Sequence, residues 1–188
     1  MTTTELWLPT NIDLNKAPAK IAFKFKAALA SGDVSVIVAK PDESGVRRVE
    51  MVVTTRLPLA KPKQQILVAD YKTEKGKSFW RNMGARPDAS VDAQVVFAAA
   101  IPFVFCLNET AEVGENFDLA CVMGSKTYKV SGRRANSAND DLESFELIVP
   151  ISKATKPQII EVEIKNGVLE SARVKLPVFG DGKLWRVS

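Results

Sequence analysis

The stretch KIAFKFK at residues 20–26 shows the pattern that decides the fold. Apolar Ile21, Phe23 and Phe25 alternate in it with residues that are mostly lysine. Successive side chains of a β-strand point to opposite faces of the sheet, so this alternation predicts a strand with one apolar and one basic face. A helix would scatter the two phenylalanines around its axis, and we therefore favour the strand.

Comparable patterns recur along most of the chain. Runs rich in β-branched or alternating apolar residues predict further strands at residues 34–39, 46–55, 66–71, 91–107, 117–123, 126–132, 144–151, 160–165, 168–178 and 183–187. Short segments with glycine, proline or small polar residues separate them and predict turns, among them residues 31–33, 41–45 and 180–182.

The clearest predicted hairpin surrounds Asn166-Gly167, and most of the apolar residues on both sides of it have even numbers. A two-residue loop would place even-numbered residues opposite odd-numbered ones, and so set apolar side chains against charged ones. We therefore predict a three-residue loop, Lys165–Gly167, in which Ile164 meets Val168. Gly167 is expected to have a positive φ, which glycine adopts without steric cost.

The strands, together with the lack of an internal repeat or linker, predict one all-β domain that spans residues 1–188. A β-barrel and a β-sandwich both fit this pattern, and we favour an elaborated barrel similar to the oligonucleotide-binding (OB) type. Residues 72–90 and 133–141 interrupt the strand pattern, and we interpret both as loops. The first predicted loop is long and basic, with room for a short helical turn at residues 79–83.

The composition excludes several classes of enzyme. The 188 residues include no histidine, which removes Ser-His-Asp and Cys-His catalysis and most zinc sites. The sequence has no Walker loop, no Rossmann fingerprint and no paired-cysteine metal spacing. We therefore expect a protein that is not an enzyme and that uses no cofactor or metal ion.

Charge and cysteine content indicate the expected setting of the protein. The net charge is +4 and 46% of the residues are hydrophobic, as in a globular protein with a mild preference for anionic partners. Residues 1–9 do not resemble a signal peptide, and the longest apolar run, residues 91–107, is interrupted by Pro102 and by polar residues. Cys106 and Cys121 lie in apolar runs and are expected to be reduced thiols. We expect a cytoplasmic protein with no membrane partner.

A positive signal for function comes from aromatic residues set among lysines and arginines. Single-stranded nucleic acid is bound by cations that follow the phosphates and by aromatic rings that stack on the bases. Residues 77–81 contain both components, and the pattern recurs around Tyr128 and around Trp185. For any one aromatic residue, a place in the core is the alternative. The predicted nucleic-acid-binding residues are Lys24, Lys26, Lys72, Lys75, Lys77, Phe79, Trp80, Arg81, Arg86, Tyr128, Arg133 and Arg134.

Two functions fit these features. The first is a non-enzymatic homo-oligomer that binds single-stranded DNA or RNA without regard to sequence. The second is a self-assembling structural protein, such as a coat, tail or decoration component of a virus or phage, whose apolar or edge-strand surfaces become covered by assembly. The absence of a long arginine-rich arm argues against a coat that binds the genome directly. A third hypothesis, a small-ligand barrel, depends on the expected fold alone.

Overall fold

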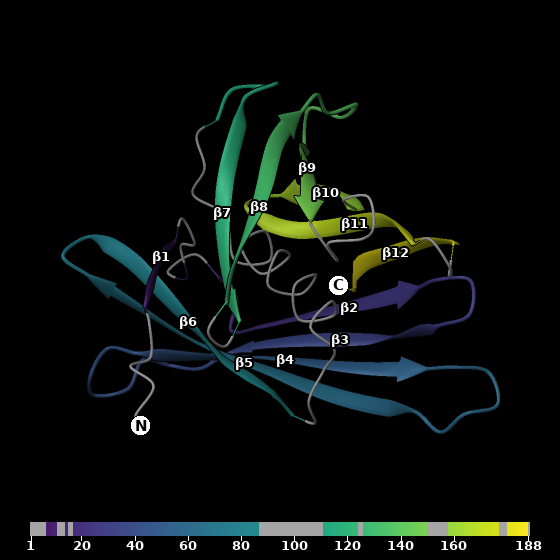
Figure 1. Ribbon diagram of the computed structural model, residues 1–188, viewed down its shortest axis with the longest axis horizontal. Coiled ribbons are helices and arrows are strands. Elements are labelled where there is room, and N and C mark those ends of the chain that lie inside the picture. Colours follow the sequence, from purple (N-terminus) through teal and green to yellow (C-terminus); the bar gives the residue numbers. More distant parts are fainter. Residues whose placement is uncertain are drawn as a thin grey trace.

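The computed structural model shows an all-β chain built on one antiparallel sheet (Figure 1). The structure describes residues 7–10, 14, 17–86, 111–123, 126–149, 158–176 and 180–187. The strands are β1 (Leu8–Thr10), β2 (Lys20–Lys26), β3 (Ser31–Val38), β4 (Arg47–Arg56), β5 (Lys63–Glu74), β6 (Lys77–Arg86), β7 (Asn116–Met123), β8 (Lys126–Ala135), β9 (Glu143–Val149), β10 (Gln158–Lys165), β11 (Val168–Leu176) and β12 (Gly180–Val187).

Two up-and-down meanders make up this 12-stranded sheet, whose order is β1-β6-β5-β4-β3-β2-β12-β11-β10-β9-β8-β7. They are joined where β12 pairs with β2, with Leu184 opposite Phe25. β1 and β7 are the edges of the sheet, and β7 comes close to β1 and β6. Within the described ranges no ladder joins the two edges, so the sheet is not closed into a barrel.

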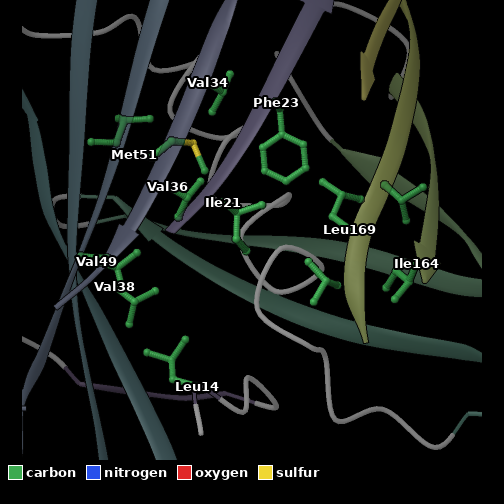
Figure 2. Packing of buried hydrophobic residues seen from close by; sticks show 14 of the residues in the cluster. Leu14, Ile21, Phe23, Val34, Val36, Val38, Val49, Met51, Ile164 and Leu169 are labelled. Atoms are coloured by element: carbon green, nitrogen blue, oxygen red, sulfur yellow. The ribbon is translucent and has the colours of Figure 1, made fainter. Parts of the chain in front are cut away.

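The core lies on one face of the sheet, where the two meanders face each other. Figure 2 shows Ile21 and Phe23 of β2 on one side of this core, with Ile164 of β10 and Leu169 of β11 on the other. Alternate residues of β2, β3 and β4 point into it, and Phe23 is among the most deeply buried side chains of the described chain. Lys24, the neighbour of Phe23, is exposed, which confirms the amphipathic strand predicted for residues 20–26.

The all-β prediction is confirmed, whereas the described strands do not close into the favoured barrel. A sandwich or OB-type arrangement stays a prediction. The strand predicted for residues 91–107, with Cys106, lies outside the described residues. No helix in the described ranges is long and apolar enough to cross a membrane.

The long basic loop predicted from residue 72 is wrong, because residues 72–86 belong to the β5–β6 hairpin. Lys75 and Gly76 form its two-residue turn, and both have positive φ values, of 50° and 74°. This geometry matches the twist of the two strands. The helical turn predicted at residues 79–83 is replaced by β6. Phe79 and Trp80 are adjacent and point to opposite faces of the strand, so the sequence here lacks the apolar–polar alternation that indicates a strand.

Two predicted turns are strand segments instead. Residues 31–33 belong to β3, and the turn before it is formed by residues 27–30, where the Ala27 N–H donates to the Ala30 carbonyl at 2.7 Å. Gly32 allows the ring of Phe25 to lie against the backbone of β3, because a Cβ atom at this position would be 2.5 Å from that ring. Residues 180–182 likewise begin β12 rather than form a turn.

The β10–β11 turn has two residues, not the three that we predicted. Lys165 pairs with Val168, and Asn166 and Gly167 between them have φ values of 53° and 72°. The positive φ of Gly167 is therefore confirmed, whereas the three-residue loop is wrong.

A β-bulge in β11, rather than a three-residue loop, brings the even-numbered residues of the two strands opposite each other. Ile164 pairs with Leu169, but Glu163 pairs with Ser171, so Glu170 is an extra residue in β11. The extra residue restores the matching of even with even numbers, because one residue is added on one strand only. The apolar face of β10 consequently stays toward the core.

Gly167→Ala is expected to lower the free energy of unfolding by about 1 kcal/mol, because alanine is strained at this positive φ. Urea denaturation would measure the change. Glu161→Ala, an exposed substitution on β10, is the control and should have little effect. Equal stabilities of the wild type and Gly167→Ala would contradict the turn geometry.

Candidate nucleic-acid interface

Basic residues come into register on the face of the sheet that points away from the core. Arg173 of β11 lies opposite Lys183 of β12, and Lys183 lies opposite Lys26 of β2. Side chains of directly opposite residues share one face, and neighbouring strands lie about 4.8 Å apart. Arg173, Lys183 and Lys26 therefore form a row about 10 Å long, which we call the basic row.

An aromatic ring lies beside the basic row. Trp185 is two residues beyond Lys183 on β12, so it shares the outer face, and it lies opposite Lys24 of β2. Its side chain is half-buried, whereas Lys24 is exposed. An open hollow of about 680 Å³ lies here, lined by Lys26, Ala27, Ala28, Asp181, Lys183 and Trp185. This hollow leaves space for a planar group next to the indole ring.

The cations of this region form no ion pair with a described residue, although Glu161 lies opposite Arg173 and Asp33 lies opposite Lys24. Arg173, Lys183, Lys26 and Lys24 are all exposed, and none forms an ion pair with another residue that the structure describes. Unpaired cations that lie close together produce a local positive potential that attracts anions. An anion that approached the basic row and Lys24 would therefore break no ion pair with a described residue.

A second group of cations surrounds Asp70 on the outer face of β5. Asp70 is only 1% exposed and lies between Arg48 of β4 and Arg81 of β6. The Arg48 Nε atom donates to Asp70 Oδ1 at 3.1 Å, and Arg81 Nη2 donates to Oδ2 at 2.8 Å. A buried carboxylate is tolerated when charged donors satisfy it in this way. The hydrogen bond to Asp70 raises the pKa of the Arg48 guanidinium above its usual value.

Aromatic rings flank the same cations. The Trp7 ring lies 4.6 Å from the guanidinium carbon of Arg81 and 4.9 Å from the Nζ atom of Lys72, as in cation–π contacts. The Lys72 Nζ atom is also 5.9 Å from the ring of Phe79 and 2.9 Å from Glu74 Oε2. The hydrogen bond from Lys72 lowers the pKa of the Glu74 carboxyl, which keeps this carboxylate ionised. We call Trp7, Lys72, Phe79 and Arg81 the aromatic–cation cluster.

The aromatic–cation cluster has less free charge than the basic row. Asp70 pairs with Arg81, and Glu74 pairs with Lys72. Two further predicted binding residues, Arg133 and Arg134 of β8, form ion pairs with acidic residues of β9. These arginines hold strands together, so their charges are already partly neutralised.

The structure separates several residues that were expected to act together. Trp80 is 4% exposed and belongs to the core, and so its ring is not accessible to a base in this structure. Phe79 points the other way, because adjacent residues of a strand face opposite sides. Lys75 and Lys77 are exposed at the β5–β6 turn. The side chains of Arg86 and Tyr128 lie outside the described part of the structure; their backbones belong to β6 and β8.

The sequence pattern did not predict Arg173 or Trp7 as binding residues. Lys183 and Trp185 showed the aromatic–basic pattern but were not included in the predicted set. Arg173 has no aromatic neighbour in sequence, and it joins the basic row only through the pairing of β11 with β12. Its outward position on the β10–β11 hairpin was the one available signal.

No protein-family model matches this chain, and no curated protein sequence is significantly similar to it. Among the described residues, no group of three or more acidic or cysteine side chains is placed to hold a metal ion. We therefore infer the function from the geometry and charge of the outer face.

Proposed function

We propose that this protein binds single-stranded nucleic acid, without regard to sequence and without catalysis, on the outer face of β11, β12 and β2. The observation that carries the proposal is the basic row, whose exposed cations form no ion pair with a described residue, next to the half-buried ring of Trp185. Cations that follow the phosphates and rings that stack on bases are the two components of such binding.

The arrangement of the outer face supports a path for one strand across the sheet. Phosphates would follow the basic row, and Lys24 would contact the backbone on the far side of the indole ring. The hollow beside Trp185 would accommodate a base that stacks on it. Stacking accepts every base, because each has a π face, and this is consistent with binding without sequence preference. We assign the aromatic–cation cluster a lesser part, since acidic side chains offset much of its charge.

Affinity for oligo-dT is expected to fall steeply with salt, with a slope of about −0.7 in log K against log salt for each phosphate contacted. Trp185→Ala is expected to weaken binding by about 1–3 kcal/mol through the loss of stacking. Fluorescence anisotropy with a labelled oligonucleotide would measure both effects. Trp185→Phe, which keeps a ring, is the control and should retain most of the affinity. Binding that does not change with salt would remove the electrostatic basis of the proposal.

A specific observation favours the second candidate, a self-assembling structural protein. Ile148 of β9 and Ile159 of β10 lie directly opposite each other, and both side chains are exposed. The edge strand β7 has a strand on only one side within the described ranges. Exposed apolar pairs and open edges favour association between copies of a chain. A homo-oligomer is compatible with either function.

Size-exclusion chromatography with light scattering, with and without oligo-dT, separates the two candidates. A small oligomer whose mass rises with oligo-dT supports the nucleic-acid-binding function. A large particle that forms alone and does not bind oligo-dT supports the structural protein.

A further inference from the structure

Three exposed leucines project from one end of the sheet. Leu29 lies in the β2–β3 turn, and Leu57 and Leu59 lie in the β4–β5 loop. Ser31 of β3 lies opposite Arg56 of β4, so both connections leave the sheet at the same end, on the right of Figure 1. We call Leu29, Leu57 and Leu59 the leucine tips.

Leu59 occupies a position that the fold does not require to be leucine. Its side chain is fully exposed, at 109% of the reference area, and so it makes little contact within the described chain. The Ala60 N–H donates to the Leu57 carbonyl at 3.3 Å, which closes a turn with Pro58 in second place and Leu59, with a φ of 61°, in third. This is the pattern of a type II turn, whose third position favours glycine. Leucine is strained there and gains no burial in return.

Four cations flank the leucine tips in the sequence. Lys26 precedes the β2–β3 turn, Arg56 precedes the β4–β5 loop, and Lys61 and Lys63 follow its tip. All four are exposed. Arg56 forms an ion pair with Asp33 at 2.6 Å, whereas the three lysines have no ion pair with a described residue. We call these four cations the basic collar.

We infer that the leucine tips insert into the interfacial region of an anionic lipid bilayer, with the basic collar at the level of the headgroups. Aliphatic side chains gain by leaving water for the acyl boundary, and nearby lysines are attracted by anionic lipids. The β2–β3 turn and the β4–β5 loop, which carry the leucine tips, can enter a deformable surface together. A protein cleft would have to match both tips in shape and also carry an acidic rim, and so we favour the bilayer.

This inference goes beyond nucleic-acid binding, because nucleic acid offers no aliphatic medium to a fully exposed leucine. It also differs from the expectation from sequence that the protein has no membrane partner. That expectation was based on the lack of a signal peptide and of a segment that could anchor in a bilayer, whereas the leucine tips would only enter its surface.

Co-sedimentation with two kinds of vesicle tests the inference. Vesicles of phosphatidylcholine mixed with phosphatidylglycerol should bind the protein more tightly than vesicles of phosphatidylcholine alone. Leu59→Gly should weaken binding to the mixed vesicles about tenfold, the effect of withdrawing one leucine from the interface. The same substitution should not lower the melting temperature, because glycine suits the turn. Replacing Lys61 and Lys63 with glutamate should remove the preference for the anionic vesicles.

Two controls separate this result from other effects. Ile37→Ser removes an exposed aliphatic side chain from β3, at the end of the sheet opposite the leucine tips, and should leave vesicle binding unchanged. Leu59→Gly should retain its affinity for oligo-dT, so the lipid and nucleic-acid proposals can fail independently. The inference is overturned if the wild type does not sediment with the mixed vesicles, a result that would direct the search to a protein partner. It is also overturned if Leu59→Gly sediments as the wild type does.

Discussion

Trp80→Ala is expected to lower the free energy of unfolding by about 3–5 kcal/mol, because it leaves a large cavity in the core. Trp80 is 4% exposed and packs within the buried cluster of the sheet. Urea denaturation followed by circular dichroism would measure the loss. Phe79→Ala is the matched control, since Phe79 is the adjacent aromatic residue on the outer face and is half-buried. Its substitution should cost considerably less.

The same two variants test which aromatic residue contacts nucleic acid. If Trp80→Ala keeps the stability of the wild type and loses affinity for oligo-dT, the ring stacks on bases and the described core position is wrong. If it loses stability while the residual folded protein still binds, Trp80 has a structural role only. The two variants thus distinguish a role in the core from a role in stacking on bases, which the sequence alone could not do.

The simultaneous replacement of Lys26, Arg173 and Lys183 with alanine is expected to weaken oligo-dT binding about 100-fold at 0.1 M salt. Each phosphate contact that is lost retains about 0.7 of a counterion on a single strand, so the salt slope should become shallower by about 2. Stability should change little, because all three side chains are exposed and have no ion pair with a described residue.

A variant with the same loss of charge elsewhere provides the control. Lys40, Lys75 and Lys77 are exposed at the opposite end of the sheet, in the β3–β4 loop and at the β5–β6 turn. Their replacement with alanine lowers the net charge equally and should leave most of the affinity. Two of these lysines belong to the set predicted from the sequence. A larger loss in this control than in the basic-row variant would move the interface to the β5–β6 hairpin.

The sequence predicts individual strands well here, because one face of each strand must be apolar to form the core. Residues 20–26 are an example, in which the alternation, the inward phenylalanines and the outward lysines are all confirmed. Predictions from this alternation failed in two places. Adjacent aromatic residues, Phe79 and Trp80, concealed strand β6, and the bulge at Glu170 shifted the register of β11. In both places the three-dimensional neighbours, rather than the local sequence, decide which way a side chain points.

The candidate site was predicted only in part, for a related reason. The alternation in residues 20–26 predicts that Lys24 and Lys26 lie on the outer face of one strand. Their alignment with Lys183 and Arg173 depends on a ladder between β2 and β12, which are far apart in the sequence. Alternation within each strand carries no information about which strand it pairs with. The basic row is thus a property of the sheet that no single segment contains.

The position of the β2–β12 ladder has a consequence for the timing of activity. β2 is synthesised early and β12 long after it, so this ladder closes the largest loop of the described chain and is expected to form late in folding. Lys26 lies on one side of this seam, and Lys183 and Trp185 lie on the other. A nascent chain that still lacks β12 holds only one part of the surface. If the outer face binds nucleic acid as we propose, the complete surface would exist only after β12 has joined the sheet, and a nascent chain beside messenger RNA would not yet present it.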